Sequence, residues 1–92
     1  MDNQPIKINK RVKILAVFED NGAEARYCLP LRMRWKGRGY TFNELGLRHP
    51  TVRGQRHVHV FDVSDGKADF RLEFDSQRLT WKLLHIAEAW HE

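Results

Sequence analysis

Cysteine and long apolar runs are scarce in this 92-residue chain, and each scarcity argues against a class of protein. The single cysteine, Cys28, cannot form a disulfide within the chain, which argues against a secreted disulfide-rich scaffold. No apolar run approaches the roughly 20 residues that a membrane-spanning helix needs. Residues 1–10 (MDNQPIKINK) lack the apolar segment of a signal peptide, so we expect a cytoplasmic protein.

The chain also lacks the sequence patterns of common catalytic sites. Residues 36–39 (KGRG) do not have the spacing of a nucleotide-binding loop. Nothing around Cys28 resembles an activating turn or a helix N-terminus, and the aspartates from residue 62 onward fall in or beside turns, where carboxylates serve turn geometry. We therefore expect a non-catalytic protein that needs no cofactor.

Basic and aromatic residues are what the chain has in quantity. Lysine and arginine number 16 against 12 acids, for a net charge of +4, and arginine outnumbers lysine. Five phenylalanines, three tryptophans and two tyrosines supply large side chains that favour strands. The length allows one domain spanning residues 1–92, with residues 1–5 expected to fray.

The most regular stretch is residues 29–42 (LPLRMRWKGRGYTF), which alternates between apolar and basic positions. This period of two predicts a strand with one buried and one solvent-facing side. The expected inward positions are Leu29, Leu31, Met33 and Trp35, and the expected outward positions are Arg32, Arg34 and Lys36. A turn at residues 37–39 then predicts a hairpin, with Tyr40 and Phe42 resuming the apolar side.

Similar patterns predict strands elsewhere. We expect strands at residues 6–8 and 12–18 with a bend at residues 9–10, at 56–63, at 67–74 and at 79–86. Residues 43–47 indicate a short helical turn, residues 48–55 a surface loop, and residues 64–66 a tight turn with Gly66 at positive φ. Residues 87–92 either extend the last strand or begin a short helix. Trp35, Phe70, Leu72 and Trp81 share inward positions and are expected to be buried together.

These elements predict an all-β fold, an antiparallel meander of about six strands curled into a small barrel or half-barrel. Strands joined by short turns, without a long helical pattern, favour a meander. Curling protects strand edges that would otherwise be exposed.

Three segments carry a resemblance to a known family: MRWKGRGYTF at residues 33–42, FRLEFD at 70–75 and WKLLHI at 81–86. In their order and spacing they resemble a family of small bacterial β domains of unknown function, encoded near Y-family, lesion-bypass DNA polymerases. The resemblance implies a β fold and a neighbourhood in DNA transactions, and it implies no activity.

Alternating arginines on one side of a sheet would make a positive surface suited to a phosphate backbone. The candidate nucleic-acid-binding residues are Arg32, Arg34, Lys36, Arg38, Arg53 and Arg56. Asp69, Glu73 and Asp75 on a later strand are able to pair with these arginines, which would leave only a solvated surface. We expect weak, backbone-directed association with nucleic acid.

Two further possibilities follow from the sequence. His57 and His59 share one side of a strand, and His49 or His85 would supply a third ligand, but the spacing of a zinc site is absent and we expect no metal. The alternative function is a protein-interaction or assembly module, through a partner protein or self-association, that uses an unpaired strand edge or the C-terminal segment with Trp90.

Overall fold

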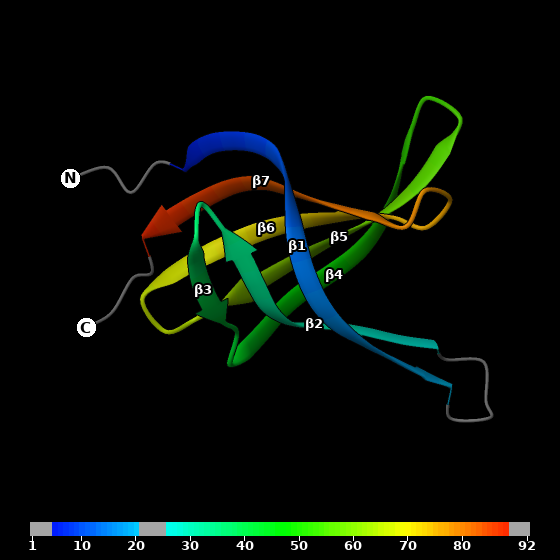
Figure 1. Cartoon of the computed structure of the whole chain (residues 1–92). Coiled ribbons are helices and arrows are strands. Elements are labelled where there is room, and N and C mark those ends of the chain that lie inside the picture. Colours follow the sequence, from blue (N-terminus) through cyan, green and yellow to red (C-terminus); the bar gives the residue numbers. More distant parts are fainter. Residues whose placement is uncertain (1–4, 21–25, 89–92) are drawn as a thin grey trace.

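Seven antiparallel strands form one sheet in the computed structural model, which describes residues 5–20 and 26–88, apart from the side chains at positions 19, 20, 26, 27, 47, 49 and 53 (Figure 1). The described residues contain no helix. The strands are β1 (Ile6–Asp20), β2 (Arg26–Trp35), β3 (Arg38–Thr41), β4 (Glu44–Arg53), β5 (Arg56–Ser64), β6 (Ala68–Asp75) and β7 (Thr80–Glu88). Their order across the sheet is β3-β2-β1-β7-β6-β5-β4.

The sheet curls into a half-barrel whose two edges meet at the link between β3 and β4. The Phe42 N–H donates to the Leu31 carbonyl at 2.9 Å, and the Asn43 N–H donates to the Ser64 carbonyl at 2.9 Å. These two bonds join the β2 side of the sheet to the β5 side. Away from the link, the β1–β2 hairpin and the β4–β5 hairpin extend separately (Figure 1). The predicted all-β half-barrel is thus confirmed.

One strand was absent from the sequence prediction. Residues 44–53, predicted as a short helical turn followed by a surface loop, form β4 instead. The strand has no apolar period, and it is specified by its pairing with β5, in which Thr51 lies opposite Val58 and Arg53 opposite Arg56. Gly54, at φ 64°, lies in the turn between the two strands.

The C-terminal segment also continues as strand. β7 reaches Glu88, which lies opposite Ala68 of β6, so the helical alternative is wrong as far as residue 88. Residues 89–92, including Trp90, lie outside the described part of the chain.

Strand β1 bends where the sequence indicated. Asn9 has φ 56°, and the pairing of β1 with β7 shifts register between Lys7 and Lys10. Asparagine tolerates this left-handed conformation better than most residues. The bend at residues 9–10 is therefore confirmed.

A bulge in β2 changes which of its residues face inward. Leu15 lies opposite Arg32, but Ala16 lies opposite Pro30, so Leu31 is an extra residue in β2. Pro30 is fully buried as a result. Leu29, predicted to face inward with Met33, instead lies opposite Val17 on the outer side. The prediction that residues 29–35 keep one uninterrupted alternation is wrong at this point.

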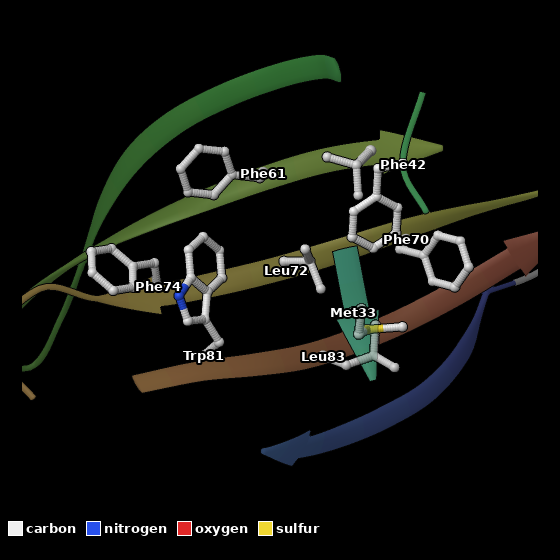
Figure 2. Packing of buried hydrophobic residues seen from close by; sticks show 9 residues of the cluster. Met33, Phe42, Phe61, Phe70, Leu72, Phe74, Trp81 and Leu83 are labelled. Carbon is white, nitrogen blue, oxygen red and sulfur yellow. The ribbon is translucent and has the colours of Figure 1, made fainter. Parts of the chain in front are cut away.

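The core lies on the inner side of the curled sheet (Figure 2). Its buried members are Met33, Phe42, Phe61, Val63, Phe70, Leu72, Phe74, Trp81 and Leu83. The Trp81 ring lies 4.7 Å from the Phe74 ring and 5.4 Å from the Phe61 ring, centroid to centroid. The predicted burial of Phe70, Leu72 and Trp81 is confirmed. Trp35 packs against this cluster but is only half-buried.

Candidate nucleic-acid interface

The densest positive charge lies on the outer side of β1 and β2. Lys13 of β1 lies directly opposite Arg34 of β2, and both side chains are exposed. Arg11, two residues before Lys13 and also exposed, belongs to the same side of β1. Arg32, two residues before Arg34, is likewise exposed. We call this surface the basic face: Arg11, Lys13, Arg32 and Arg34, with Lys36 at its rim.

The basic face is hollowed in two adjoining places. One hollow, of about 430 Å³, has no acid among its described lining residues, which are Arg11, Val12, Lys13, Arg34, Trp35, Lys36 and Gly37. The second, of about 620 Å³, shares Lys13 and Arg34 with the first and reaches across to β3.

The hairpin turn carries Lys36, another of the predicted cations of this region. Lys36 and Gly37 have φ 53° and 73°, the two-residue turn whose twist suits a tight hairpin. The Lys36 ammonium lies 4.8 Å from the centre of the Trp35 ring. Lys36 also lines the hollow of about 430 Å³, from a position at the turn.

Arg38 belongs to the other side of the hairpin. It lies directly opposite Trp35, and its guanidinium carbon lies 5.4 Å from the centre of the Tyr40 ring. Since residues opposite each other in a ladder share a side, Arg38 points away from Arg32 and Arg34. It is exposed near the turn, where it can add charge without belonging to the basic face.

The acids of β6 lie away from the cations of β2, although Glu73 and Asp75 line a hollow of about 120 Å³ together with Arg11 of the basic face. Strands β1 and β7 separate β6 from β2, and Asp69 lies opposite Ser64 and Ala87 instead. Glu73 lies opposite Val60 and Lys82. The proposed pairing of these two acids with the arginines of residues 32–38 is therefore wrong.

The third acid does pair with a candidate arginine, Arg56. A guanidinium nitrogen of Arg56 donates to Asp75 at 2.8 Å, so Arg56 is held at the start of β5, where it lines a hollow of about 120 Å³ with Asp75 and with Arg11 of the basic face. Arg53 lies opposite Arg56 in the backbone register, and its side chain is outside the description. The structure thus divides the six sequence candidates between separate parts of the sheet.

Asp75 is also fixed by the turn that follows it. One carboxylate oxygen accepts the backbone N–H groups of Gln77 and Arg78, at 3.0 and 3.2 Å. Burial alone would raise the pKa of Asp75, but these two bonds and the Arg56 guanidinium outweigh it and hold that pKa below its ordinary value. The Arg56–Asp75 pair is accordingly a structural element of the turn.

A second ion pair occupies the outer side of β5 and β6. Arg71 donates two hydrogen bonds to Asp62, at 2.7 and 3.0 Å, and the bidentate bond raises the pKa of Arg71 despite partial burial. His85, opposite Arg71 on β7, has a buried Nδ1 without a hydrogen-bond partner. Burial, and then the nearby Arg71 charge, lower the pKa of His85, which favours the neutral imidazole.

The histidines expected to share a strand side do so, since His57 and His59 both belong to β5. His59 lies opposite Phe74, with the two rings 6.5 Å apart, and burial followed by the Arg48 charge lowers its pKa. The side chain of His49 is outside the description. Among the described side chains, no three His, Cys, Asp or Glu residues lie close enough together to hold a metal ion.

The sheet has two edges, β3 and β4. β4 is the longer, but it contains Pro50, which has no N–H to donate, and its register with β5 shifts between Leu45 and Arg48. Proline and bulges are devices that hinder edge-to-edge pairing. These features make β4 a poor template for an added strand.

Two basic-face residues, Arg11 and Lys13, are missing from the sequence candidates. The signal was present, because they alternate with Val12 and Ile14, which pack against the core. What the alternation does not reveal is their partner. Only the register of β1 with β2 shows that Lys13 lies beside Arg34.

Comparison of the chain with protein-family models, with curated proteins and with solved structures found no match. Among the described residues, no helix has the length and apolar character needed to cross a membrane.

Proposed function

We propose that this domain is a non-catalytic module that binds nucleic acid weakly through its basic face. The observation that carries the proposal is the hollow of about 430 Å³, which four cations line without an acid among its described residues. Lys13 and Arg34 lie directly opposite each other there. Like charges in directly opposed strand positions are destabilising, and a bound anion would relieve the repulsion.

A phosphate backbone suits this surface better than a single small anion does. The cations extend along two neighbouring strands, with Arg11 and Lys13 on β1 and Arg32 and Arg34 on β2. Side chains two apart on a strand are separated by roughly 6–7 Å, so each strand presents charge repeatedly along its length. Repeated phosphates gain affinity there by releasing counterions, whatever the base sequence.

The resemblance to small bacterial domains encoded near lesion-bypass polymerases supports the same reading. The resemblance implies that the domain acts near DNA transactions, and it assigns no role to any single residue. A cytoplasmic location would give the basic face access to nucleic acid.

Fluorescence anisotropy with a labelled single strand and a labelled duplex, at low and moderate salt, tests the proposal. We expect the double variant Arg32→Glu/Arg34→Glu to lose binding while it melts at nearly the parent temperature, because both side chains are exposed. The parent's logarithmic affinity should fall linearly with the logarithm of salt concentration, by about 0.7–0.9 per phosphate contacted.

The matched control is Lys67→Glu/Arg78→Glu, which changes net charge equally at two exposed turn positions outside the basic face. It should keep most of the parent's affinity. If neither nucleic acid binds the parent at low salt, or if both double variants bind alike, the basic face is only a solvated surface. A stable oligomer that salt leaves intact would then favour the assembly module.

A further inference from the structure

The basic face is not basic throughout, because exposed apolar side chains adjoin its cations. Leu15 is 56% exposed and lies directly opposite Arg32, and Val17, two residues further along β1, is 39% exposed. Leu29 lies opposite Val17 on the same outer side. The outer surface of the β1–β2 hairpin therefore changes from charged to apolar along its length.

Leu15 lines the larger hollow, of about 620 Å³, together with Lys13, Arg32 and Arg34. On the β3 side the hollow is kept open by Gly39, opposite Arg34, where a Cβ would meet nothing within 4 Å. An occupant of this hollow would touch an apolar side chain and several cations at once.

We infer that the occupant is a single-stranded nucleic acid, with an unpaired base packed on Leu15 while its phosphates lie along Lys13, Arg32 and Arg34. This inference rests on the proposed function. A duplex keeps its base faces stacked and presents mainly phosphates to a surface of this kind, so it gains nothing from Leu15. A single strand can turn a base face onto the protein, and every base has such a face.

The chemistry of the contact also limits its specificity. Trp35 and Tyr40, the aromatic side chains nearest the cations, pack against the core instead of standing on the outer side. An aliphatic contact with a base excludes water but reads no hydrogen-bond pattern. The domain should accordingly prefer single strands over duplexes with little preference among base sequences.

The test compares the parent with Leu15→Thr, using a labelled single-stranded homopolymer and a labelled duplex of equal length. The parent should bind the single strand more tightly. Leu15→Thr should weaken that binding by about three- to tenfold, as the loss of one apolar contact implies, and leave duplex binding and both salt slopes unchanged. Threonine keeps the β propensity of the position, and melting curves check the fold.

Val52→Thr is the control, since Val52 is 58% exposed on β4 and distant from β2 in strand order. It should bind as the parent does. A second variant, Gly39→Val, fills the open side of the hollow without changing charge, and it should also weaken single-strand binding.

Tighter binding of the duplex, or unchanged single-strand affinity in both Leu15→Thr and Gly39→Val, would overturn the inference. The proposed function would survive that result if Arg32→Glu/Arg34→Glu still abolished binding. If the parent bound neither probe, the proposed function would be the one that failed, and this inference would fail with it.

Discussion

The outer surfaces of β1–β2 and of β5–β6 both carry charged side chains but arrange them in opposite ways. On β5 and β6, Asp62 and Arg71 lie opposite each other and form a bidentate pair. On β1 and β2, Lys13 and Arg34 lie opposite each other and repel. The first arrangement pairs opposite charges, whereas the second places two positive charges next to each other.

This difference separates structural charge from charge available for binding. Counting arginines along the sequence treats Arg56 and Arg34 alike. In the structure, Arg56 is paired with Asp75, while Arg34 lies directly opposite Lys13 and both line the same hollow. Partly exposed pairs such as Asp62–Arg71 contribute about 1 kcal/mol or less to stability, so the contrast concerns which cations have a paired carboxylate more than how stable the fold is.

The largest expected effect comes from cutting the core packing between β6 and the β3 side of the sheet. Phe70 of β6 is 2% exposed, and its ring lies 5.4 Å from Tyr40 and 5.3 Å from Phe42. Phe70→Ala should lower the free energy of unfolding by about 3–5 kcal/mol, enough to unfold so small a domain. Urea denaturation measures the change.

Phe18→Ala is the matched control, because Phe18 is 61% exposed although its ring lies 5.7 Å from that of Phe74. It should cost far less than Phe70→Ala. Equal losses in the two variants would mean that the described core does not hold the regions together.

Two glycines, one in the β5–β6 turn and one on β3, differ in the backbone conformation that they adopt. Gly66, between β5 and β6, has φ 92°, as the sequence predicted, while Gly39 on β3 has an ordinary strand conformation and open space at its Cβ position. Gly66→Ala should destabilise by about 1–2 kcal/mol, because a side chain strains this conformation. Gly39→Ala should be neutral or slightly stabilising. Thermal melting of both variants checks this, and the opposite ranking would contradict the assigned turn.

The alternation of apolar and polar residues predicted the strands and turns that depend on local sequence. The alternation in residues 67–74 placed Phe70 and Leu72 inward, and the Asp-Gly pair placed the turn. β4 escaped prediction because Pro50 and its neighbours have no period, and pairing with β5 overrides their weak preference for strand. The bulge at Leu31 escaped for a related reason, since a bulge exists only relative to a partner strand.

The candidate site was partly predictable for the same reason. Arg32 and Arg34 follow from alternation alone, and their exposure agrees with it. That Lys13 lies opposite Arg34, and that Arg56 is paired instead with Asp75, depends on long-range register. Sequence therefore indicates which residues are basic and exposed, and pairing decides which of them remain available.

Reversing one charge in the repelling pair should separate stability from binding. Lys13→Glu would place a carboxylate opposite Arg34, so the free energy of unfolding should rise by about 0.2–1 kcal/mol. Binding of a labelled single strand should fall, because the hollow loses a cation and gains an acid. Lys67→Glu, in the turn after β5, should change neither quantity appreciably. If Lys13→Glu lowered the free energy of unfolding, or kept the parent's affinity for the single strand, the repulsion between Lys13 and Arg34 would be unrelated to ligand binding.

The smallest effect at neutral pH is expected from the Arg56–Asp75 pair. In Asp75→Asn the side-chain oxygen can still accept the Gln77 and Arg78 N–H groups, but the amide nitrogen that replaces Oδ2 cannot accept from Arg56, so the charge and the Arg56 hydrogen bond are lost together. The partly exposed Arg56 side chain is screened by solvent, which keeps the effect small. The effect should depend on pH in a known direction. The pKa of Asp75 is lower in the folded chain than in the unfolded one, so its charge stabilises the fold above the unfolded value of about 4. That contribution is lost as pH falls through the lower, folded pKa.

The parent should therefore be more stable than Asp75→Asn near pH 7. The urea midpoints of the two proteins should converge on acidification, because the parent's carboxylate is then neutral as well. A difference that stayed constant from pH 7 to about pH 2 would mean that Asp75 stabilises the turn by hydrogen-bond geometry alone, and the contrast between paired and unpaired charge would then rest on Asp62–Arg71.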